Sequence, residues 1–503
     1  MTFPRSWIEA RGLRADLIAV LAGALTAMAL PPLHIVPCLL VAFPLLLARI
    51  DVAKGWFAAA RQGWWFGFGH HLIGLYWITE AILIEAARYW WLVPLAVPAL
   101  AALLAIFIAI PVALAWFFAP GLARVATLAG AWGLADLARQ FVATGFPWNP
   151  LGSIWAMPGF AGDVMIQPAA LVSVHGLTLA TVCLACAPAL NWRGRGLCLC
   201  LALAWIGFGI TRTLAPPPPD QAIQVVLVQG NVPQGQKWDP AFLLTVFERY
   251  LHLTDEGAGA AGQGPRVVVW PETASPFQLA TDRAAREAIA NASHGSLVLA
   301  GAVRFDEADR PRNAVFAIAG AGIISALYDK WHLVPFGEYQ PNWIPIGIQL
   351  VPGGGFARGP GPQTLHFPAV PPVGPLICYE AIFPGQVVDE DDRPTWMVNM
   401  TNDAWFGTSS GPRQHLAAAR LRAVEEGLPL LRAANTGITA GFDSRGHEIT
   451  RLSMGQTGFR TVTLPGPLPP TFFARFGLMV PGLLALSLVA VGLLTTQLRW
   501  YRG

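Results

Sequence analysis

Charged side chains are scarce in this chain. Only 13% of its 503 residues are Asp, Glu, Lys or Arg, whereas an ordinary soluble domain carries about 25%. Hydrophobic residues make up 54%, and the mean hydropathy is +0.48. This balance excludes a wholly soluble protein and a disordered chain, and a formal net charge of +3 gives no basis for binding nucleic acid. The composition therefore predicts a membrane protein.

Cysteine is equally sparse, with 6 residues in the whole chain. Five of them fall in apolar segments or at their edges, where cysteine behaves as a small hydrophobe. Cys378 is the only cysteine in the long middle segment, so no disulfide can form within that segment. Three roles remain open for Cys378: a buried core residue, a link to another chain, or a reactive thiol.

Long apolar runs are grouped near the two ends of the chain. A membrane-spanning helix needs roughly 20 mostly apolar residues. We expect about eight such helices, near residues 17–30, 33–48, 56–80, 91–118, 122–141, 164–190, 197–211 and 477–498. The first two are short, so a re-entrant hairpin is an alternative for them. The first run also resembles a cleavable signal peptide.

Lys and Arg in the short connections set the orientation of these helices. If the N-terminus is cytoplasmic, most basic residues of the connections also lie in the cytoplasm. This asymmetry sends the middle segment across the membrane. We therefore expect residues 1–213 to form a membrane domain of about seven helices, residues 214–465 an outer domain, and residues 466–503 a last transmembrane helix with a cytoplasmic tail.

The middle segment alternates between strand and helix patterns. β-branched apolar runs predict buried strands at 224–228, 266–270, 297–300 and 396–400. Helical patterns lie at 240–254, 281–292 and 412–426. This alternation predicts one layered α/β domain.

Three stretches of this domain place an ionisable group directly after an apolar run. They contain Glu272, Lys330 and Cys378, and strand ends in α/β proteins gather functional sites. A thiol is a weak nucleophile at neutral pH until a base removes its proton or a cation stabilises the thiolate. The three residues thus suggest a base, a cation and a nucleophile. His332 and His415 leave a Cys-His pair open as an alternative.

These stretches resemble the Glu-Lys-Cys signature of the nitrilase, or carbon-nitrogen hydrolase, superfamily. The seven leading helices and one trailing helix resemble its membrane-bound branch, the apolipoprotein N-acyltransferases. Further motifs match this branch in chain order, at residues 74–77, 144–148, 229–234, 237–238, 401–407 and 435–439.

The resemblance implies an α-β-β-α sandwich on the periplasmic side of the bacterial inner membrane. It implies that Glu272 is the general base, that Lys330 stabilises the oxyanion and that Cys378 is acylated. The positions implied to support these three are Glu338, Tyr379, Glu380 and Trp238. Among them Glu338 would orient Lys330, and the Tyr379 main-chain N–H would be a second oxyanion donor.

The implied reaction is phospholipid-dependent N-acylation of the N-terminal diacylglyceryl-cysteine of apolipoproteins, the last step of lipoprotein maturation. It would follow a ping-pong mechanism through a Cys378 thioester. The partners are then a phospholipid, an apolipoprotein and the bilayer, with no nucleic acid, no cofactor and no metal, and a monomer is compatible with this chemistry. A membrane-tethered nitrilase-type amidase is the alternative, although a hydrolase of soluble substrates needs one anchor rather than eight. A non-catalytic scaffold or transporter is a third hypothesis.

Two further predictions concern lipid access and charges within the membrane. Residues 343–356 and the loop around 405–407 are candidates for a lid or lipid entrance, and packing against the sandwich is the alternative for both. Asp136 and Arg139 lie at helical spacing in the fifth span and predict a buried ion pair. His70 and His71 lack a third ligand, which argues against a metal site.

Overall fold

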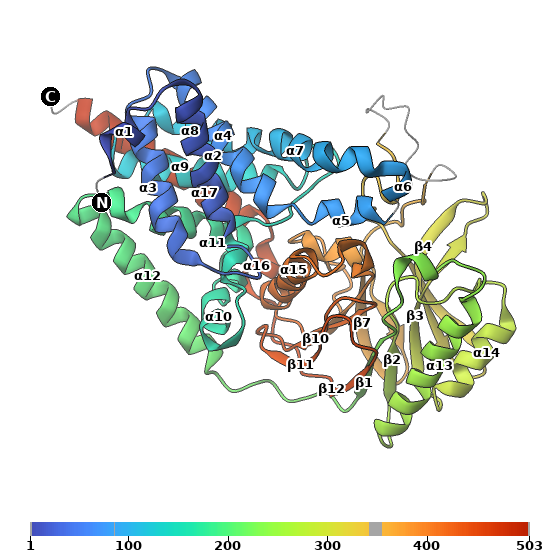
Figure 1. Cartoon of the computed structure of the whole chain (residues 1–503). Coiled ribbons are helices and arrows are strands. Elements are labelled where there is room, and N and C mark those ends of the chain that lie inside the picture. Colours follow the sequence, from blue (N-terminus) through green and yellow to red (C-terminus); the bar gives the residue numbers. More distant parts are fainter. Residues whose placement is uncertain (1–2, 85, 342–354, 501–503) are drawn as a thin grey trace. The chain divides into compact units, whose positions relative to one another are not determined.

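The computed structural model describes residues 3–84, 86–341 and 355–500 (Figure 1). The chain forms two compact units. The helical unit consists of Met1–Ala215, Ser409–Leu421 and Thr471–Gly503, and the sheet unit consists of Pro216–Thr408 and Arg422–Pro470. Each unit is organised around hydrophobic clusters of its own.

The helical unit is built from apolar helices, which satisfy their backbone hydrogen bonds internally. In chain order they are α1 (Arg5–Ile8), α2 (Gly12–Ala27), α3 (Leu39–Asp51), α4 (Trp56–Gly74), α5 (Ile78–Leu83), α6 (Ala86–Tyr89), α7 (Val93–Leu104), α8 (Ile106–Trp116), α9 (Leu122–Ala138), α10 (Gly159–Ile166), α11 (Ala169–Cys186), α12 (Trp192–Thr213), α16 (Phe472–Phe476) and α17 (Met479–Trp500). Most of α15 (Gly411–Glu426) also belongs to this unit.

Four helical stretches in the described part of the chain are long and apolar enough to cross a membrane. They are Ala86–Trp116, Ala169–Ala189, Trp192–Thr213 and Met479–Thr496, and they coincide with four of the eight expected spans. The other four expected spans contain α2, α3, α4 and α9, with 16, 13, 19 and 17 residues. A spanning role for these four helices stays a prediction.

Glycines allow α2 and α4 to pack at backbone contact. A Cβ atom on Gly23 of α2 would lie 1.8 Å from the main-chain oxygen of Phe66, and a Cβ on Gly69 of α4 would lie 2.0 Å from that of Val20. Neither backbone could remain in place beside a larger residue. Small residues at helix crossings are the usual means of close packing between membrane helices.

The expected ion pair of α9 is present. Arg139 Nη2 lies 2.8 Å from Asp136 Oδ1, and both side chains are buried. Arg139 also donates to the main-chain oxygen of Trp148. The prediction of a buried pair is therefore confirmed.

The segment Ser409–Leu421 groups with the helices, although the sequence placed all of 214–465 in one outer domain. Gln414 explains this grouping. Its side chain accepts a hydrogen bond from Trp148 Nε1 at 2.9 Å and donates to the main-chain oxygens of Pro31 and Gly74. The amide of Gln414 thus satisfies polar groups from three separate parts of the helical unit.

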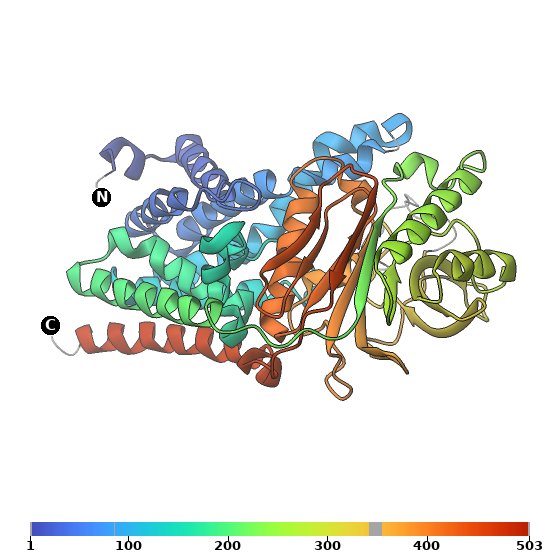
Figure 2. The ribbon, with the colours of Figure 1, turned by 90° about the horizontal axis from the view of Figure 1, so that it is seen from below.

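In its described residues, the sheet unit contains two six-stranded sheets. The strands are β1 (Gln224–Gln229), β2 (Arg266–Val269), β3 (Leu297–Phe305), β4 (Pro311–Ala319), β5 (Ile323–Asp329), β6 (Leu365–Phe367), β7 (Val370–Ile377), β8 (Trp396–Thr401), β9 (Leu430–Ala434), β10 (Thr439–Phe442), β11 (Glu448–Leu452) and β12 (Gly458–Thr463). The first sheet has the order β12-β1-β2-β3-β4-β5, and the second has the order β11-β10-β9-β8-β7-β6. Figure 2 shows the first strand, β1, running beside the last, β12, with which it pairs in antiparallel fashion.

Both faces of the central strands are buried, which explains why they are apolar without interruption. In β1, Val225 and Leu227 join the core between the two sheets, whereas Val226 and Val228 join the core beneath the helices. These helices are α13 (Leu243–Ala260) and α14 (Arg283–Ala292). The strands and helices predicted from the sequence in this segment are all present, with small shifts at their ends.

The topology places several strand ends at one edge of the sandwich. Strands β1, β2 and β3 are parallel within the first sheet, and β7, β8 and β9 are parallel within the second. Carboxyl ends of parallel neighbours lie along one edge of a sheet, where loops can bring their side chains together. The residues that follow β7 and β8 are therefore neighbours, and the main-chain N–H of Asn402, after β8, donates to the carboxylate of Glu272, after β2 of the other sheet.

A substitution of Trp396 tests the packing between the two sheets. It is 0% exposed in the core between the sheets, and its Nε1 donates to the Pro371 oxygen at 3.0 Å. We expect Trp396→Ala to lower the free energy of unfolding by about 3–5 kcal/mol, as for other buried aromatic truncations. Denaturant titration of the purified variant and wild-type proteins measures this difference in the free energy of unfolding. Ile323→Ala, at a position 66% exposed, is the matched control, and equal losses in the two variants would contradict the assignment.

Candidate functional site

The three residues predicted to form a site follow three different strands of the sheet unit. Glu272 comes shortly after β2, Lys330 directly after β5, and Cys378 directly after β7. Their exposed fractions are 6%, 1% and 6%. Electrostatic interactions connect Cys378 with both Glu272 and Lys330. The fold therefore brings all three predicted residues together in a buried position.

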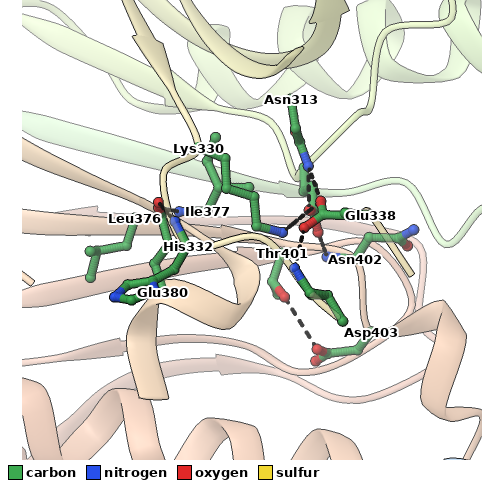
Figure 3. Close-up of polar contacts among 12 residues, drawn as sticks. Asn313, Lys330, His332, Glu338, Leu376, Ile377, Glu380, Thr401, Asn402 and Asp403 are labelled. Carbon is green, nitrogen blue, oxygen red and sulfur yellow. Dashed lines mark hydrogen bonds and ion pairs between the residues drawn. The ribbon is translucent and has the colours of Figure 1, made fainter. Parts of the chain in front are cut away.

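Lys330 is the centre of the polar contacts. Its Nζ lies 3.0 Å from Glu272 Oε1 and 2.8 Å from Glu338 Oε1. Asn313 Nδ2 donates to the same two carboxylate oxygens, at 2.7 Å and 3.0 Å. Figure 3 shows the side chains of Lys330, Asn313 and Glu338 pointing towards one another. Asn402 completes the set, because its main-chain N–H donates to Glu272 Oε2 at 2.9 Å.

The charges in this cluster determine the protonation states of Glu272 and Lys330. Burial by itself would raise the pKa of Glu272, but the ammonium groups of Lys330 and Lys237 and the hydrogen bonds from Lys330 and Asn313 outweigh it, so this pKa is lowered. Burial would likewise lower the pKa of Lys330, but Glu272 and Glu338 raise it well above its usual value. Glu272 is thus a carboxylate and Lys330 an ammonium ion at neutral pH.

Cys378 begins a 3-10 turn, Cys378–Ile382, with its backbone in the left-handed region at φ +51°. Such a conformation is strained for a residue with a side chain and is found at functional positions held by surrounding structure. Burial raises the pKa of the thiol, Glu272 raises it further, and Lys330 lowers it. The resting residue is therefore a thiol that has a carboxylate and an ammonium ion as neighbours.

Glu380 joins the strand that carries the lysine to the strand that carries the cysteine. Its Oε1 accepts from the Trp331 N–H at 2.7 Å, and its Oε2 accepts from the Ile377 N–H at 2.6 Å and the Tyr328 hydroxyl at 2.9 Å. Burial raises the pKa of Glu380 to about 7. One carboxyl group thus fixes the spacing between the ends of β5 and β7, and with it the position of Cys378.

The other predicted positions differ in their surroundings. Glu338 is held by the Val334 N–H, which donates to its Oε2 at 2.8 Å. The ring of Tyr379 is buried and packs edge-on against Phe383. Trp238 is 48% exposed, and at this corner its neighbour Lys237 reaches the main-chain oxygen of Glu272, at 3.0 Å. The sequence matched Lys237 as part of the motif at 237–238 but gave it no role.

Other contacting residues were given no role from the sequence. Asn402 and Asp403 lie in the matched motif 401–407 and directly follow a predicted strand, so the strand-end rule that indicated Cys378 applies to them as well. Asp403 forms a fully buried ion pair with Arg432 at 2.7 Å. Asn313 had no recognisable sequence signal, because it lies within β4. It reaches the site through strand pairing, in which the main-chain nitrogen of Lys330 donates to the main-chain oxygen of Asn313 at 2.8 Å.

The geometry favours Glu-Lys-Cys chemistry over a Cys-His pair. His332 Nε2 lies 2.7 Å from Gln386 Oε1, and burial lowers the pKa of its ring to about 4. His415 belongs to the helical unit, where its ring lies beside Trp148. In the described ranges, no group of three His, Cys, Asp or Glu could hold a metal ion. A carboxylate, an ammonium ion and a thiol together can support acyl transfer through a thioester, because the thiol can act as a nucleophile activated by the neighbouring base.

The two candidate lid segments differ in what can be described. Residues 343–354 lie outside the described residues. Gly355 and Phe356 follow them, and the main-chain N–H of Phe356 donates to the main-chain oxygen of Glu338 at 2.7 Å. Trp405, in the 3-10 turn Asp403–Phe406, is 40% exposed. A lid function for either segment stays a prediction.

Glu380→Gln tests the junction between β5 and β7. An amide nitrogen cannot accept hydrogen bonds, so one of two main-chain N–H groups, that of Trp331 or that of Ile377, would lose its acceptor inside the protein. We expect a loss of about 1–3 kcal/mol in the free energy of unfolding, with a fall in turnover because Cys378 is displaced. Denaturant titration and an activity assay measure the two effects. Glu287→Gln on α14, which removes an exposed pair, should change neither, and an unchanged Glu380→Gln protein would contradict the assigned role.

Two family models match this chain. The family model described as apolipoprotein N-acyltransferase N-terminal domain matches residues 22–187, and the carbon-nitrogen hydrolase model matches residues 224–462. Among solved structures, a nitrilase-superfamily member of branch 10 from Saccharomyces cerevisiae matches with a TM-score of 0.37 and 17% identity, over 48% of this chain and 90% of that chain. An amidase from Nesterenkonia sp. matches with a TM-score of 0.37 and 16% identity, over 50% of this chain and 92% of that chain.

Relatives of full length carry the stronger likeness. The apolipoprotein N-acyltransferase of Rhodopseudomonas palustris is 39% identical over 502 residues, which cover 93% of both chains. That of Sinorhizobium medicae is 40% identical over 488 residues, which cover 91% of both chains. These matches extend across the helical unit and the sheet unit alike. The chain therefore belongs to the apolipoprotein N-acyltransferase family and is an acyltransferase with a nitrilase-like carbon-nitrogen hydrolase domain.

Proposed function

We propose that this acyltransferase moves an acyl chain from a membrane phospholipid to the α-amino group of the N-terminal diacylglyceryl-cysteine of apolipoproteins, the last step of lipoprotein maturation. The observation that carries the proposal is the buried contact of 3.0 Å between Lys330 and Glu272, with Cys378 under the influence of both charges. Family membership supports the choice of substrates. No cofactor enters the chemistry.

The proposed first half-reaction acylates Cys378. The Glu272 carboxylate takes the thiol proton, and the sulfur attacks the ester carbonyl of the phospholipid. Lys330 and the Tyr379 main-chain N–H stabilise the oxyanion that forms, and each such donor contributes about 2.7–4 kcal/mol of transition-state stabilisation in comparable sites. The proton then passes from Glu272 to the departing alkoxide, so lysophospholipid leaves and a thioester remains.

The proposed second half-reaction releases the acyl chain to the amine. The free α-amino group of the apolipoprotein attacks the thioester, Glu272 accepts its proton, and the Cys378 thiolate leaves and is reprotonated. An amide bond forms as the thioester breaks, which gives the triacylated product. Glu338 orients Lys330 in both halves, and Glu380 and Trp238 support the site.

We also propose the membrane placement. Drawing an acyl chain of about 16 carbons into water would cost on the order of 12 kcal/mol at about 0.8 kcal/mol per CH₂, so the site must open at a bilayer surface. Eight spans in a bacterial inner membrane would place residues 214–465 on the periplasmic side, with 1–213 and 466–503 as the membrane parts. The four apolar helices of spanning length and the distribution of basic residues support this arrangement.

Acyl-enzyme formation is the direct test. Purified protein incubated with phospholipid should gain the mass of one acyl group by intact-mass spectrometry, and Cys378→Ala should gain none. Addition of a diacylglyceryl-cysteine peptide should remove the added mass and yield N-acylated peptide. Release of free fatty acid in place of that product would instead favour the amidase hypothesis. Acylation of the Cys378→Ala protein would contradict covalent catalysis through this thiol.

The base and the cation have separable predicted effects. Glu272→Gln should slow acyl-enzyme formation by about 10²–10⁴-fold, the usual contribution of a positioned general base. Lys330→Met should slow it by about 10²–10³-fold through loss of an oxyanion donor. Single-turnover kinetics measure both rates. Glu448→Gln, on the exposed part of β11, should keep the wild-type rate, and wild-type rates in the two site variants would overturn the assigned roles.

A further inference from the structure

Lysine is unusually rare in this chain, which contains three lysines and 30 arginines. Lys54 is exposed in the connection between α3 and α4. The other two are Lys237 and Lys330, which are 3% and 1% exposed, and both contact Glu272. At every other basic position of the sheet unit, histidine aside, the chain uses arginine. Lysine is thus kept where a compact ammonium ion with an adjustable pKa is needed.

Lys237 and Lys330 hold Glu272 through different atoms. Lys330 contacts the carboxylate, whereas Lys237 Nζ donates to the main-chain oxygen at 3.0 Å. Lys237 directly follows the 3-10 turn Gln234–Gln236, which lies after β1, so it links that loop to the loop after β2. The site therefore contains a second buried cation that the Glu-Lys-Cys signature does not assign.

The charges that act on Lys237 belong to the reacting groups. Burial lowers the pKa of Lys237 to about 8, while Glu272 and Cys378 raise it. Electrostatic coupling between two ionisable groups is reciprocal. A thiolate at Cys378 that favours the Lys237 ammonium ion is therefore favoured by that ion to the same extent.

The other charges around Cys378 act on the thiolate in opposite directions. Glu272 and Asp403 both oppose formation of the thiolate, and Lys330 favours it. Lys330 is shared between two carboxylates, at 3.0 Å and 2.8 Å, and Arg432 is paired with Asp403 at 2.7 Å. Each of these cations has an anionic partner in direct contact, whereas the contact of Lys237 is with a neutral carbonyl oxygen.

We propose that Lys237 is a positioning residue of the acyl-transfer site, which fixes the main chain of Glu272 and adds positive charge that favours the Cys378 thiolate. This role rests on the proposed function. When the thiol proton moves to the Glu272 carboxylate, negative charge moves from oxygen to sulfur. Lys330 loses one of its two anionic partners at that step, and Lys237 supplies a second ammonium ion whose charge stabilises the sulfur.

Alkylation of Cys378 measures this effect without any acyl donor. The full-length enzyme in detergent is treated with iodoacetamide at pH 7, below the pKa of Lys237, and the rate of modification is read from the mass of the peptide that carries Cys378. Lys237→Met removes the charge and the hydrogen bond, Lys237→Gln keeps a donor without charge, and Lys237→Arg keeps both. Lys54→Met makes the same chemical change at an exposed position.

We expect labelling at pH 7, where Lys237 carries its charge, to be about ten-fold slower in Lys237→Met and Lys237→Gln, as expected for loss of a nearby opposite charge. Lys237→Arg should return the rate towards wild type, and Lys54→Met should match wild type. An unchanged rate in Lys237→Gln overturns the proposal, and that variant decides if Lys237→Met does not fold. A slower rate in Lys237→Met alone also overturns it, because the hydrogen bond would then be sufficient.

The two proposals fail in different ways. If wild-type enzyme forms no acyl-enzyme with phospholipid, the proposed substrates are wrong, yet the alkylation rates still report whether Lys237 acts on Cys378. If acylation occurs normally and the alkylation rates do not change, the acyl-transfer function stands and Lys237 has no electrostatic role.

Discussion

The burial of the Lys330 ammonium ion is the constraint on which the site depends. An ammonium ion that is 1% exposed is costly unless anions and hydrogen-bond acceptors replace its water. Glu272 and Glu338 provide that replacement, and Asn313 bridges the same two oxygens. These residues come from different loops and strands, so the ion can be buried only when the first sheet is fully assembled. Assembly of the first sheet is therefore coupled to formation of the charged cluster around Lys330.

The second sheet is joined to this centre by side chains that fix two strand ends. Glu380 accepts hydrogen bonds from the chain on both sides, at Trp331 and Ile377, and so sets where Cys378 lies. The main-chain N–H of Asn402 holds the second oxygen of Glu272. A strained backbone at Cys378 is tolerated because these contacts determine it. The sandwich thus positions a carboxylate, an ammonium ion and a thiol without any of them lying within a regular strand.

The distribution of charge distinguishes this site from the rest of the molecule. Elsewhere the basic side chains are mostly arginines, many of which form ion pairs such as Arg304 with Asp329 and Arg420 with Asp163. In the site the chain keeps two lysines, whose ammonium groups are compact and whose protonation responds to burial. Charge is scarce in the four helical stretches of the described chain that are long and apolar enough to cross a membrane.

The sequence by itself determined the membrane class, the layered α/β domain and the positions of Glu272, Lys330 and Cys378, because apolar periodicity and polar residues at strand ends are local signals. It did not determine the contacts of Asn313 or Lys237, since strand pairing and loop packing bring distant residues together and leave no local pattern. Nor did it show that Ser409–Leu421 groups with the helices, because Gln414 becomes a partner for three separate segments only in the folded chain. The sequence thus determines which chemical groups are present, whereas the topology determines which of them become neighbours. The contact between the Lys237 ammonium group and the main-chain oxygen of Glu272 is an example.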